Sequence, residues 1–147
     1  QRKRRGVALI VANSEGDILV LEELESKPEL GKLSGMFSIP METAKRGESD
    51  AAIVRRLIEE ESPGLLSKIS VVETRCGVYE VVPRIRVTLY TARCDGRPLP
   101  DGNADGVGGH NWIDPREALK LQLRRGAKAM IQDYIDNRSF IRRRRCE

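Results

Sequence analysis

The chain has 147 residues, of which 39% are hydrophobic and 33% are charged, and its formal net charge is +4. This length and composition predict one globular domain over residues 1–147 and exclude an intrinsically disordered chain. No apolar run approaches the roughly 18 to 20 residues of a membrane span, and the first residues are basic where a signal peptide is apolar, which excludes a membrane protein and favours a cytoplasmic one.

The cysteines agree with that compartment. Cys76, Cys94 and Cys146 are odd in number, lack CxxC spacing and have no neighbouring histidine. This pattern indicates free thiols in a reducing environment.

Both ends of the chain are basic, with QRKRR at residues 1–5 and IRRRRCE at 141–147. Such segments can bind nucleic acid or polyphosphate through their charge. Because no aromatic residues are interleaved to stack on bases, the pattern favours solvated, frayed ends over a nucleic-acid site.

The first part of the chain predicts β-strands. Two apolar runs, GVALIVA at 6–12 and ILVLEEL at 18–24, flank a Gly-containing turn and predict a β-hairpin. The polar stretch that follows contains proline and glycine and predicts a surface loop. MFSIP at 36–40 predicts a short strand that ends at Pro40.

A helix is predicted from Ser49 to Glu61. Ser49 is a good N-cap, and Asp50 places an anion in the first turn, where the helix dipole favours it. The apolar residues have the i, i+3, i+4, i+7 spacing of one buried face: Ala51, Ala52, Ile53, Val54, Leu57 and Ile58. SPG at 62–64 ends the helix.

This helix ends in three glutamates that lie on different sides of the helix. At about 100° per residue, Glu61 falls near the centre of the apolar face, Glu60 at its edge, and Glu59 on the opposite side. A carboxylate on a core-facing stripe is costly unless it is paired or binds a cation. Glu60 and Glu61 are therefore the candidate functional pair, and Glu59 is ordinary surface charge.

The second part is β-rich and then helical. The segments 69–82 and 84–94 predict a long antiparallel pair, and a Gly- and Asp-rich loop follows at 95–109. HNWID at 110–114 predicts a strand before two helices between Pro115 and Phe140. The order of elements, without a repeated βα period, predicts an α+β fold with a mixed, partly antiparallel sheet between helices.

Residues 42–64 resemble the Nudix box, the family pattern G-x5-E-x7-R-E-U-x-E-E-x-G-U, in which U is a bulky apolar residue. Without gaps, the conserved positions of the pattern fall on Glu48, Arg56, Ile58, Glu60 and Glu61. A register shifted by one would use Arg55, Leu57, Glu59 and Glu60. Helical phase favours the gapless register, because the second Glu of the pair lies on the apolar face only at Glu61.

The resemblance covers nearly the whole chain and implies a Nudix-like α/β/α sandwich. It also implies a metal-dependent hydrolase of a phosphoanhydride in which a nucleoside diphosphate is linked to another moiety. In such a site Mg²⁺ or Mn²⁺, held by carboxylate oxygens, neutralises the pyrophosphate and activates a water molecule. The resemblance implies Glu48, Glu60 and Glu61 as metal ligands and Glu60, Glu61 and Arg56 as catalytic residues, with Arg56 orienting a carboxylate.

The chain departs from the box at three positions. Glu42 stands at the first Gly, Leu57 at the Glu that follows the Arg, and Pro63 at the closing Gly. Leu57 cannot bind metal or orient water, which keeps a second hypothesis open: a catalytically inactive module that recognises a nucleotide, nucleic acid or protein partner. His110 is a candidate general base, although a lone histidine beside a loop is more often structural.

Overall fold

The computed structural model describes residues 4–81, 84–101 and 106–146, with the backbone alone at 71–76 and 138–146. Its strands are β1 (Arg4–Ala12), β2 (Ile18–Glu23), β3 (Phe37–Ser38), β4 (Met41–Thr43), β5 (Ile69–Glu80), β6 (Ile85–Cys94) and β7 (Val107–Ile113). Its α-helices are α1 (Asp50–Glu61), α2 (Pro115–Ala118) and α3 (Ala127–Cys146), and its short 3-10 helices are η1 (Pro28–Leu30) and η2 (Leu66–Lys68).

The strands form one mixed sheet in the order β3-β2-β1-β6-β5, with β4 paired to β1 and β7 paired to β2. β1 runs parallel to β6, from Arg4 opposite Ile85 to Ala12 opposite Arg93. The other pairings between the named strands are antiparallel. The predicted mixed α+β class is confirmed.

The hairpin predicted for the first two strands exists only at its turn. β1 and β2 are joined by the pairing of Ala12 with Ile18, and beyond it they diverge to different neighbours. The physical reason lies in β1 itself, whose side chains from Val7 to Val11 are all buried. Such a continuous apolar run is typical of a central strand that is covered on both faces, and here β6 and β4 take the places beside it.

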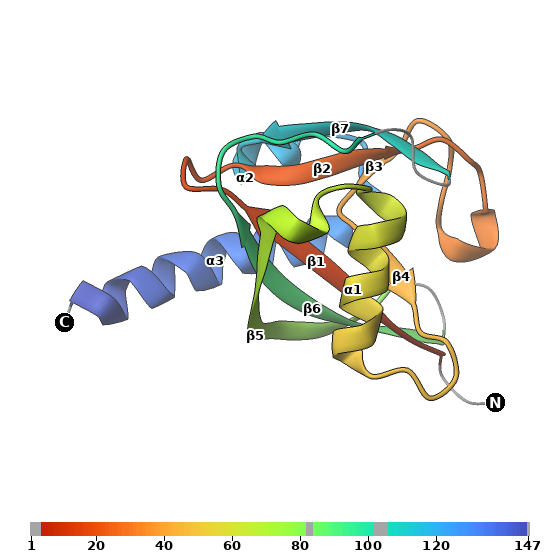
Figure 1. Ribbon diagram of the computed structural model, residues 1–147, viewed down its shortest axis with the longest axis horizontal. Helices are drawn as coiled ribbons and strands as arrows, with labels where there is room; N and C mark the ends of the chain where they lie inside the picture. The colour runs from red at the N-terminus through yellow and green to blue at the C-terminus, as the bar shows by residue number, and fades with distance from the viewer. Residues whose placement is uncertain (1–3, 82–83, 102–105, 147) are drawn as a thin grey trace.

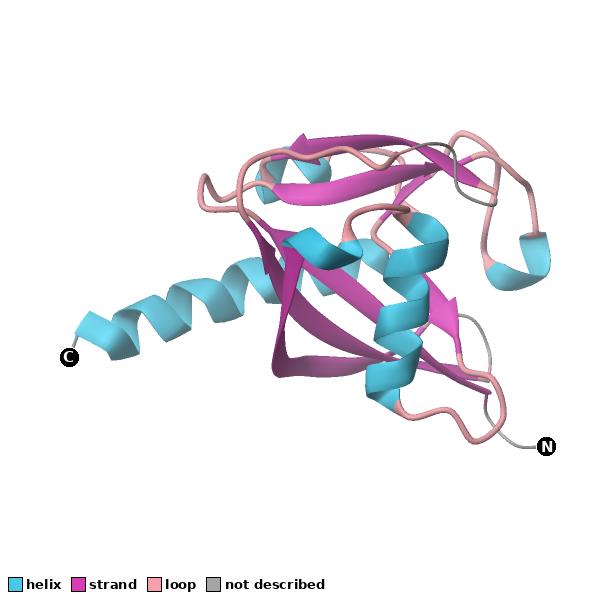
Figure 2. Cartoon of the chain, in the orientation of Figure 1, coloured by secondary structure: helices cyan, strands magenta, loops and turns pink. Residues whose placement is uncertain are grey.

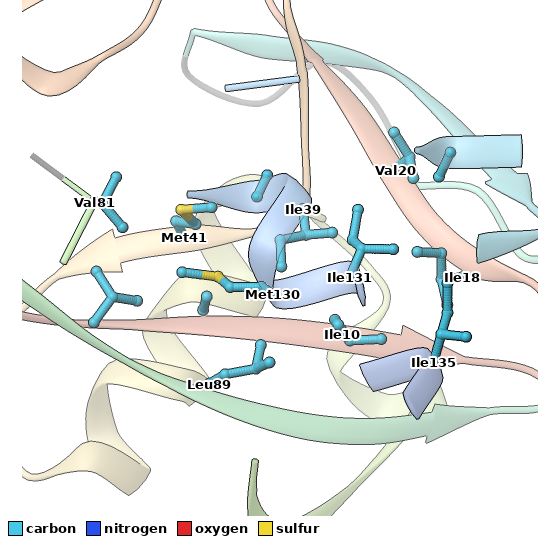
Figure 3. Packing of buried hydrophobic residues seen from close by; sticks show 14 of the residues in the cluster. Ile10, Ile18, Val20, Ile39, Met41, Val81, Leu89, Met130, Ile131 and Ile135 are labelled. Atoms are coloured by element: carbon cyan, nitrogen blue, oxygen red, sulfur yellow. The ribbon is translucent and has the colours of Figure 1, made fainter. Parts of the chain in front are cut away.

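Helices cover both faces of the sheet, which confirms the α/β/α sandwich (Figure 1). Side chains alternate along a strand, so β1 sends Val7, Leu9 and Val11 into the core beneath α1 and Ala8 and Ile10 into the core beneath α3. Figure 3 shows the second core, where α3 packs its apolar side chains onto the sheet, among them Met130, Ile131 and Ile135. Figure 2 shows α1 on the opposite face of the sheet from α3.

The strand predicted at 36–40 is divided by Pro40. Proline has no N–H for a ladder, and the chain changes partner at this point: β3 pairs with β2, and β4 pairs with β1. The change of partner brings Met41, Glu42 and Thr43 beside α1. Two further boundaries differ from the prediction, because α2 ends at Ala118 and β7 already begins at Val107.

The N-terminal arginines are more ordered than expected. Arg4 and Arg5 belong to β1, and Arg5 donates to the Asp50 carboxylate and to the Glu48 carbonyl. The helix α3 continues to Cys146, and among its residues with described side chains the last one in the core is Ile135. Within the described residues, no helix has the length and apolarity needed to cross a membrane.

Candidate functional site

The helix α1 positions the candidate glutamates. Its N-cap is Ser49, whose Oγ accepts a hydrogen bond from the Ala52 N–H at 3.2 Å. The buried face carries the four large apolar residues and Glu61, which is only 7% exposed, whereas Glu59 and Glu60 are exposed. The burial predicted from helical phase is therefore confirmed for Glu61, and the solvent-facing position is confirmed for Glu59.

Glu61 is a buried carboxyl group that points at β4. Its Oε1 accepts a hydrogen bond from the Met41 N–H at 2.9 Å. Burial raises the pKa of Glu61 to about 8, and the Met41 hydrogen bond and the charge of Lys32 offset only part of that rise. In the protein without a bound cation, the protonated form of Glu61 is therefore favoured at neutral pH.

Arg56 and Glu48 form a fork. The Arg56 Nε and Nη2 donate to the two oxygens of Glu48, each at 2.9 Å, and Nη2 also donates to the Thr43 carbonyl at 2.8 Å. The Lys45 N–H donates to Glu48 Oε1 at 2.8 Å. Arg56, followed by this backbone contact, lowers the pKa of Glu48 to about 2. The fork ties the loop before α1 to the middle of the helix.

The same guanidinium holds two further carboxylates. Its Nη1 lies 3.4 Å from Glu60 Oε2 and 3.5 Å from Glu42 Oε1. We call Arg56 with Glu42, Glu48 and Glu60 the Arg56 cluster. Burial, together with a hydrogen bond to Glu60, raises the pKa of Glu42.

Glu42 was not predicted as a site residue. In sequence it occupies the first glycine position of the box, and its place in the cluster depends on the change of strand partner at Pro40. Glu42 also contributes to the raised pKa of Glu61. Glu42 thus interacts electrostatically with both Glu60 and Glu61. The alternation of buried Met41 with a neighbouring charge is the one local signal that could have indicated it.

A second unpredicted carboxylate lies on β2. Glu23 is 1% exposed, with the Arg124 Nη1 at 3.6 Å and the Lys32 Nζ at 3.8 Å from its oxygens. Its Oε2 has no hydrogen-bond partner among the described residues. A charge this deeply buried in a strand is costly without compensation, but its sequence neighbours Glu22 and Glu25 make it look like surface charge.

Leu57 faces the core and not the cluster. Its side chain is fully buried among Val7, Leu9, Ile53 and other apolar residues beneath α1. A core residue therefore occupies the position at which the box has a glutamate, and the site has no carboxylate at that position.

His110 contacts the end of α1. Its Nε2 lies 2.7 Å from the Glu61 carbonyl, which can only accept, so Nε2 carries the proton and donates. Burial lowers the pKa of His110, which favours this neutral form. The contact satisfies a helix C-terminal carbonyl that would otherwise lack a partner, and it supports the structural interpretation of this histidine.

No three carboxylate, imidazole or thiol groups converge as a closed metal cage within residues 4–81, 84–101 and 106–146. A hydrogen bond joins Glu42 and Glu60, and Glu48 is engaged by Arg56 through both of its oxygens. Carboxylate oxygens are the donors that Mg²⁺ and Mn²⁺ prefer. Mg²⁺ is commonly held by one or two carboxylates together with substrate phosphates, and the donors present fit such an open site.

Similarity to known proteins is found at the level of the family and of the fold. The sequence matches the family model described as NUDIX domain over residues 2–134. A comparison with curated proteins found no match.

Many solved structures are similar to this chain. A Caenorhabditis elegans Ap4A hydrolase, in a binary complex, is 12% identical with a TM-score of 0.72, over 91% of this chain and 98% of that chain. The NUDIX domain of Shewanella oneidensis NrtR, complexed with ADP ribose, is 14% identical with a TM-score of 0.70, over 93% and 89%. DR0079 from Deinococcus radiodurans is 16% identical with a TM-score of 0.70, over 88% and 81%. At these identities the similarity shows the fold.

Proposed function

Because the chain belongs to the NUDIX domain family, we propose that it is a metal-dependent hydrolase of a phosphoanhydride in which a nucleoside diphosphate is linked to another moiety. The observation that carries the proposal is the Arg56 cluster, in which one guanidinium gathers three carboxylates at the end of α1. An Ap4A hydrolase and a NUDIX domain complexed with ADP ribose share the fold, which supports a nucleotide-like substrate.

Glu60 and Glu61 are the proposed ligands of Mg²⁺ or Mn²⁺, with Glu42 as a further carboxyl group that interacts with both. Glu48, the third ligand that the family resemblance implies, would have to use lone pairs that Arg56 leaves free. When bound, the ion supplies electrostatic stabilisation of the phosphate charge.

The residues of the cluster have separate proposed roles. Glu60 is the most exposed of its carboxylates, with 45% of its side chain accessible, and it shares a hydrogen bond with Glu42. It is therefore placed to accept a proton from the attacking water. Arg56 orients Glu60 and keeps its charge, while the Glu48 fork holds Arg56 in position.

The burial of Leu57 favours a second candidate, a module of the same fold that binds a nucleotide, nucleic acid or protein partner without hydrolysis. In this candidate the Arg56 cluster would bind a ligand without hydrolysing it, because no carboxylate takes the place of the box glutamate that Leu57 replaces.

Hydrolysis of a substrate panel with Mg²⁺ or Mn²⁺ separates the two candidates. The panel contains nucleoside di- and triphosphates, dinucleoside polyphosphates and nucleotide sugars. We expect Glu60→Gln and Glu61→Gln each to lower kcat at least about 100-fold. Glu59→Gln is the matched control, because Glu59 is on the same turn but faces solvent and pairs with Arg55 at 3.7 Å.

Absence of turnover by the wild-type protein over the whole panel would contradict the hydrolase proposal. Retained nucleotide binding without divalent metal would then support the binding module.

A further inference from the structure

A cleft of about 130 Å³ lies next to the Arg56 cluster. Its charged lining comes from three segments: Lys27 and Lys32 around η1, Arg124 before α3, and Glu42 of β4. Apolar side chains complete it, among them Met41 and Val81, which Figure 3 places at one end of the core beneath α3. We call it the lysine-arginine cleft.

The charge of this cleft is opposite to that of the neighbouring cluster. Three cations and one carboxylate line the cleft, whereas three carboxylates surround one cation in the Arg56 cluster. Apolar walls strengthen electrostatic interactions because they exclude water. The lysine-arginine cleft therefore favours an anion.

Arg124 is buried but incompletely satisfied. It is 7% exposed, its Nη2 donates to the Leu30 carbonyl at 3.0 Å, and its Nη1 lies 3.6 Å from Glu23, beyond hydrogen-bond distance. Its Nε has no partner among the described residues. Because a buried donor left unsatisfied costs free energy, an acceptor group that enters the cleft and reaches this Nε would relieve that cost.

Glu23 is buried beside Arg124, with its Oε1 3.6 Å from the arginine Nη1. It also lies 3.8 Å from the Lys32 Nζ, so one buried carboxylate is shared by two of the cations that line the cleft. Glu23 itself does not line the cleft. Its geometry is that of a positioning residue for Lys32 and Arg124.

The size and position of the cleft restrict the anion. A cavity of about 150 Å³ holds one benzene molecule, so this cleft accommodates one small group and not a nucleoside with its phosphates. Glu42 belongs to both the cleft and the Arg56 cluster. A phosphate chain that reacts at the cluster can therefore extend one group into the cleft.

We propose that the lysine-arginine cleft binds an additional phosphate of the substrate, beyond the anhydride that is cleaved, through Lys32 and Arg124, with Glu23 as their positioning residue. This inference rests on the proposed function and narrows the substrate class. It favours substrates with three or more consecutive phosphates, such as nucleoside triphosphates and dinucleoside polyphosphates, over diphosphate-linked sugars.

Calorimetric binding of inorganic tripolyphosphate tests the cleft without any hydrolysis. Lys32→Gln and Arg124→Gln should each weaken tripolyphosphate binding about tenfold or more. Arg125→Gln is the matched control, since Arg125 is the exposed neighbour of Arg124 and does not line the cleft. Lys32→Gln keeps the test decisive if the Arg124 variant does not fold, because the Lys32 side chain is 19% exposed.

Kinetics test the substrate class and the role of Glu23. The ratio of kcat/KM for a nucleoside triphosphate to kcat/KM for a nucleotide sugar should fall about tenfold in Lys32→Gln. Glu23→Gln should raise KM for the triphosphate more than it lowers kcat, and Glu23→Asp should recover part of the loss, which a purely structural role would not produce.

Equal tripolyphosphate affinity in Lys32→Gln, Arg124→Gln and Arg125→Gln would overturn the inference, even if the protein hydrolyses its substrates. Selective loss of tripolyphosphate binding in the first two variants, in a protein without turnover, would support the cleft and contradict only the hydrolase proposal.

Discussion

Glu48 and Glu61 are two carboxyl groups of the candidate site, and their pKa values are shifted in opposite directions. Arg56 lowers the pKa of Glu48 to about 2, whereas burial raises the pKa of Glu61 to about 8. Environments that separate the pKa values of paired carboxyls are typical of sites that transfer protons or bind cations. Glu48 is therefore ionised beside Arg56 at neutral pH, whereas the protonated form of the buried Glu61 is favoured.

Glu61→Gln tests the consequence of that burial for stability. The unfolded carboxyl ionises near its ordinary value, while the buried one keeps its proton up to about pH 8, so wild-type stability should fall as pH rises between about 4.5 and 8. Gln keeps an oxygen for the Met41 N–H. At pH 9, without divalent metal, the variant should be more stable on the order of 2–4 kcal/mol in urea unfolding.

Glu59→Gln serves as the control and should retain the wild-type dependence on pH. The explanation fails if Glu61→Gln loses stability between pH 6 and pH 9 as steeply as the wild type does.

Arg56→Lys tests the fork with Glu48. An ammonium group cannot donate to both carboxylate oxygens as a guanidinium does, so the pKa of Glu48 should rise from about 2 toward its ordinary value of 4.5. The stabilisation that depends on ionised Glu48 would then be lost at a higher pH as the solution is acidified. Carboxyl NMR titration measures this change. Arg55→Lys, at an exposed position of the same helix, should leave it unaltered, and an unchanged Glu48 titration in Arg56→Lys would contradict the assignment.

At the scale of the element, one face of α1 both packs against the sheet and carries a candidate site residue. Its buried stripe packs against the sheet through Ile53, Val54, Leu57 and Ile58, and the same stripe continues into Glu61. Leu57 lies one helical turn before Glu61. The helix therefore gains core packing at a position where the family pattern has a carboxylate.

Leu57→Glu should not restore a complete site. The new carboxylate would be placed in the apolar core beneath α1, and we expect a loss of at least about 3 kcal/mol in urea unfolding. Leu57→Met, which conserves volume, should cost less than about 1.5 kcal/mol. A Leu57→Glu variant that is as stable as the wild type and hydrolyses faster would show that this side chain can turn toward the cluster.

At the scale of the whole molecule, a hydrophobic core lies on each face of the sheet, and a different helix covers each core. The core beneath α1 supports the Arg56 cluster, and the core beneath α3 holds the other face through Met130, Ile131 and Ile135. The helix α3 continues to Cys146 and extends beyond the sheet in Figure 1. The basic segment 141–147 thus follows the part of α3 that stabilises the domain.

Replacement of Arg142, Arg143, Arg144 and Arg145 by Gln should leave the thermal unfolding temperature and any hydrolysis unchanged, because the core side chains that the structure describes in α3 end at Ile135, before them. Ile131→Ala, in the same helix, should cost about 2–5 kcal/mol. Binding of single-stranded nucleic acid at several salt concentrations tests the solvated-end prediction. Salt-sensitive binding that disappears in the arginine variant would contradict it.

The sequence by itself determined the features that depend on local chemistry. Ser49 caps α1, the 3.6-residue period buries Glu61 and exposes Glu59, and the order of elements indicates a mixed sheet between helices. These features follow from interactions within a few residues of one another. Helical phase also favours the gapless register of the box, whereas the α/β/α layers were implied by the family resemblance and are confirmed.

Only the tertiary structure decided which distant residues meet. Pairing of β1 with β6 and the change of partner at Pro40 depend on long-range packing, and they bring Glu42 beside Arg56. Burial of Glu23 with Lys32 and Arg124 joins segments up to about a hundred residues apart, and the sequence carries no local signal for it. The charge of each group could be read from the chain, but whether it faces water, a partner or a cleft was settled by the fold.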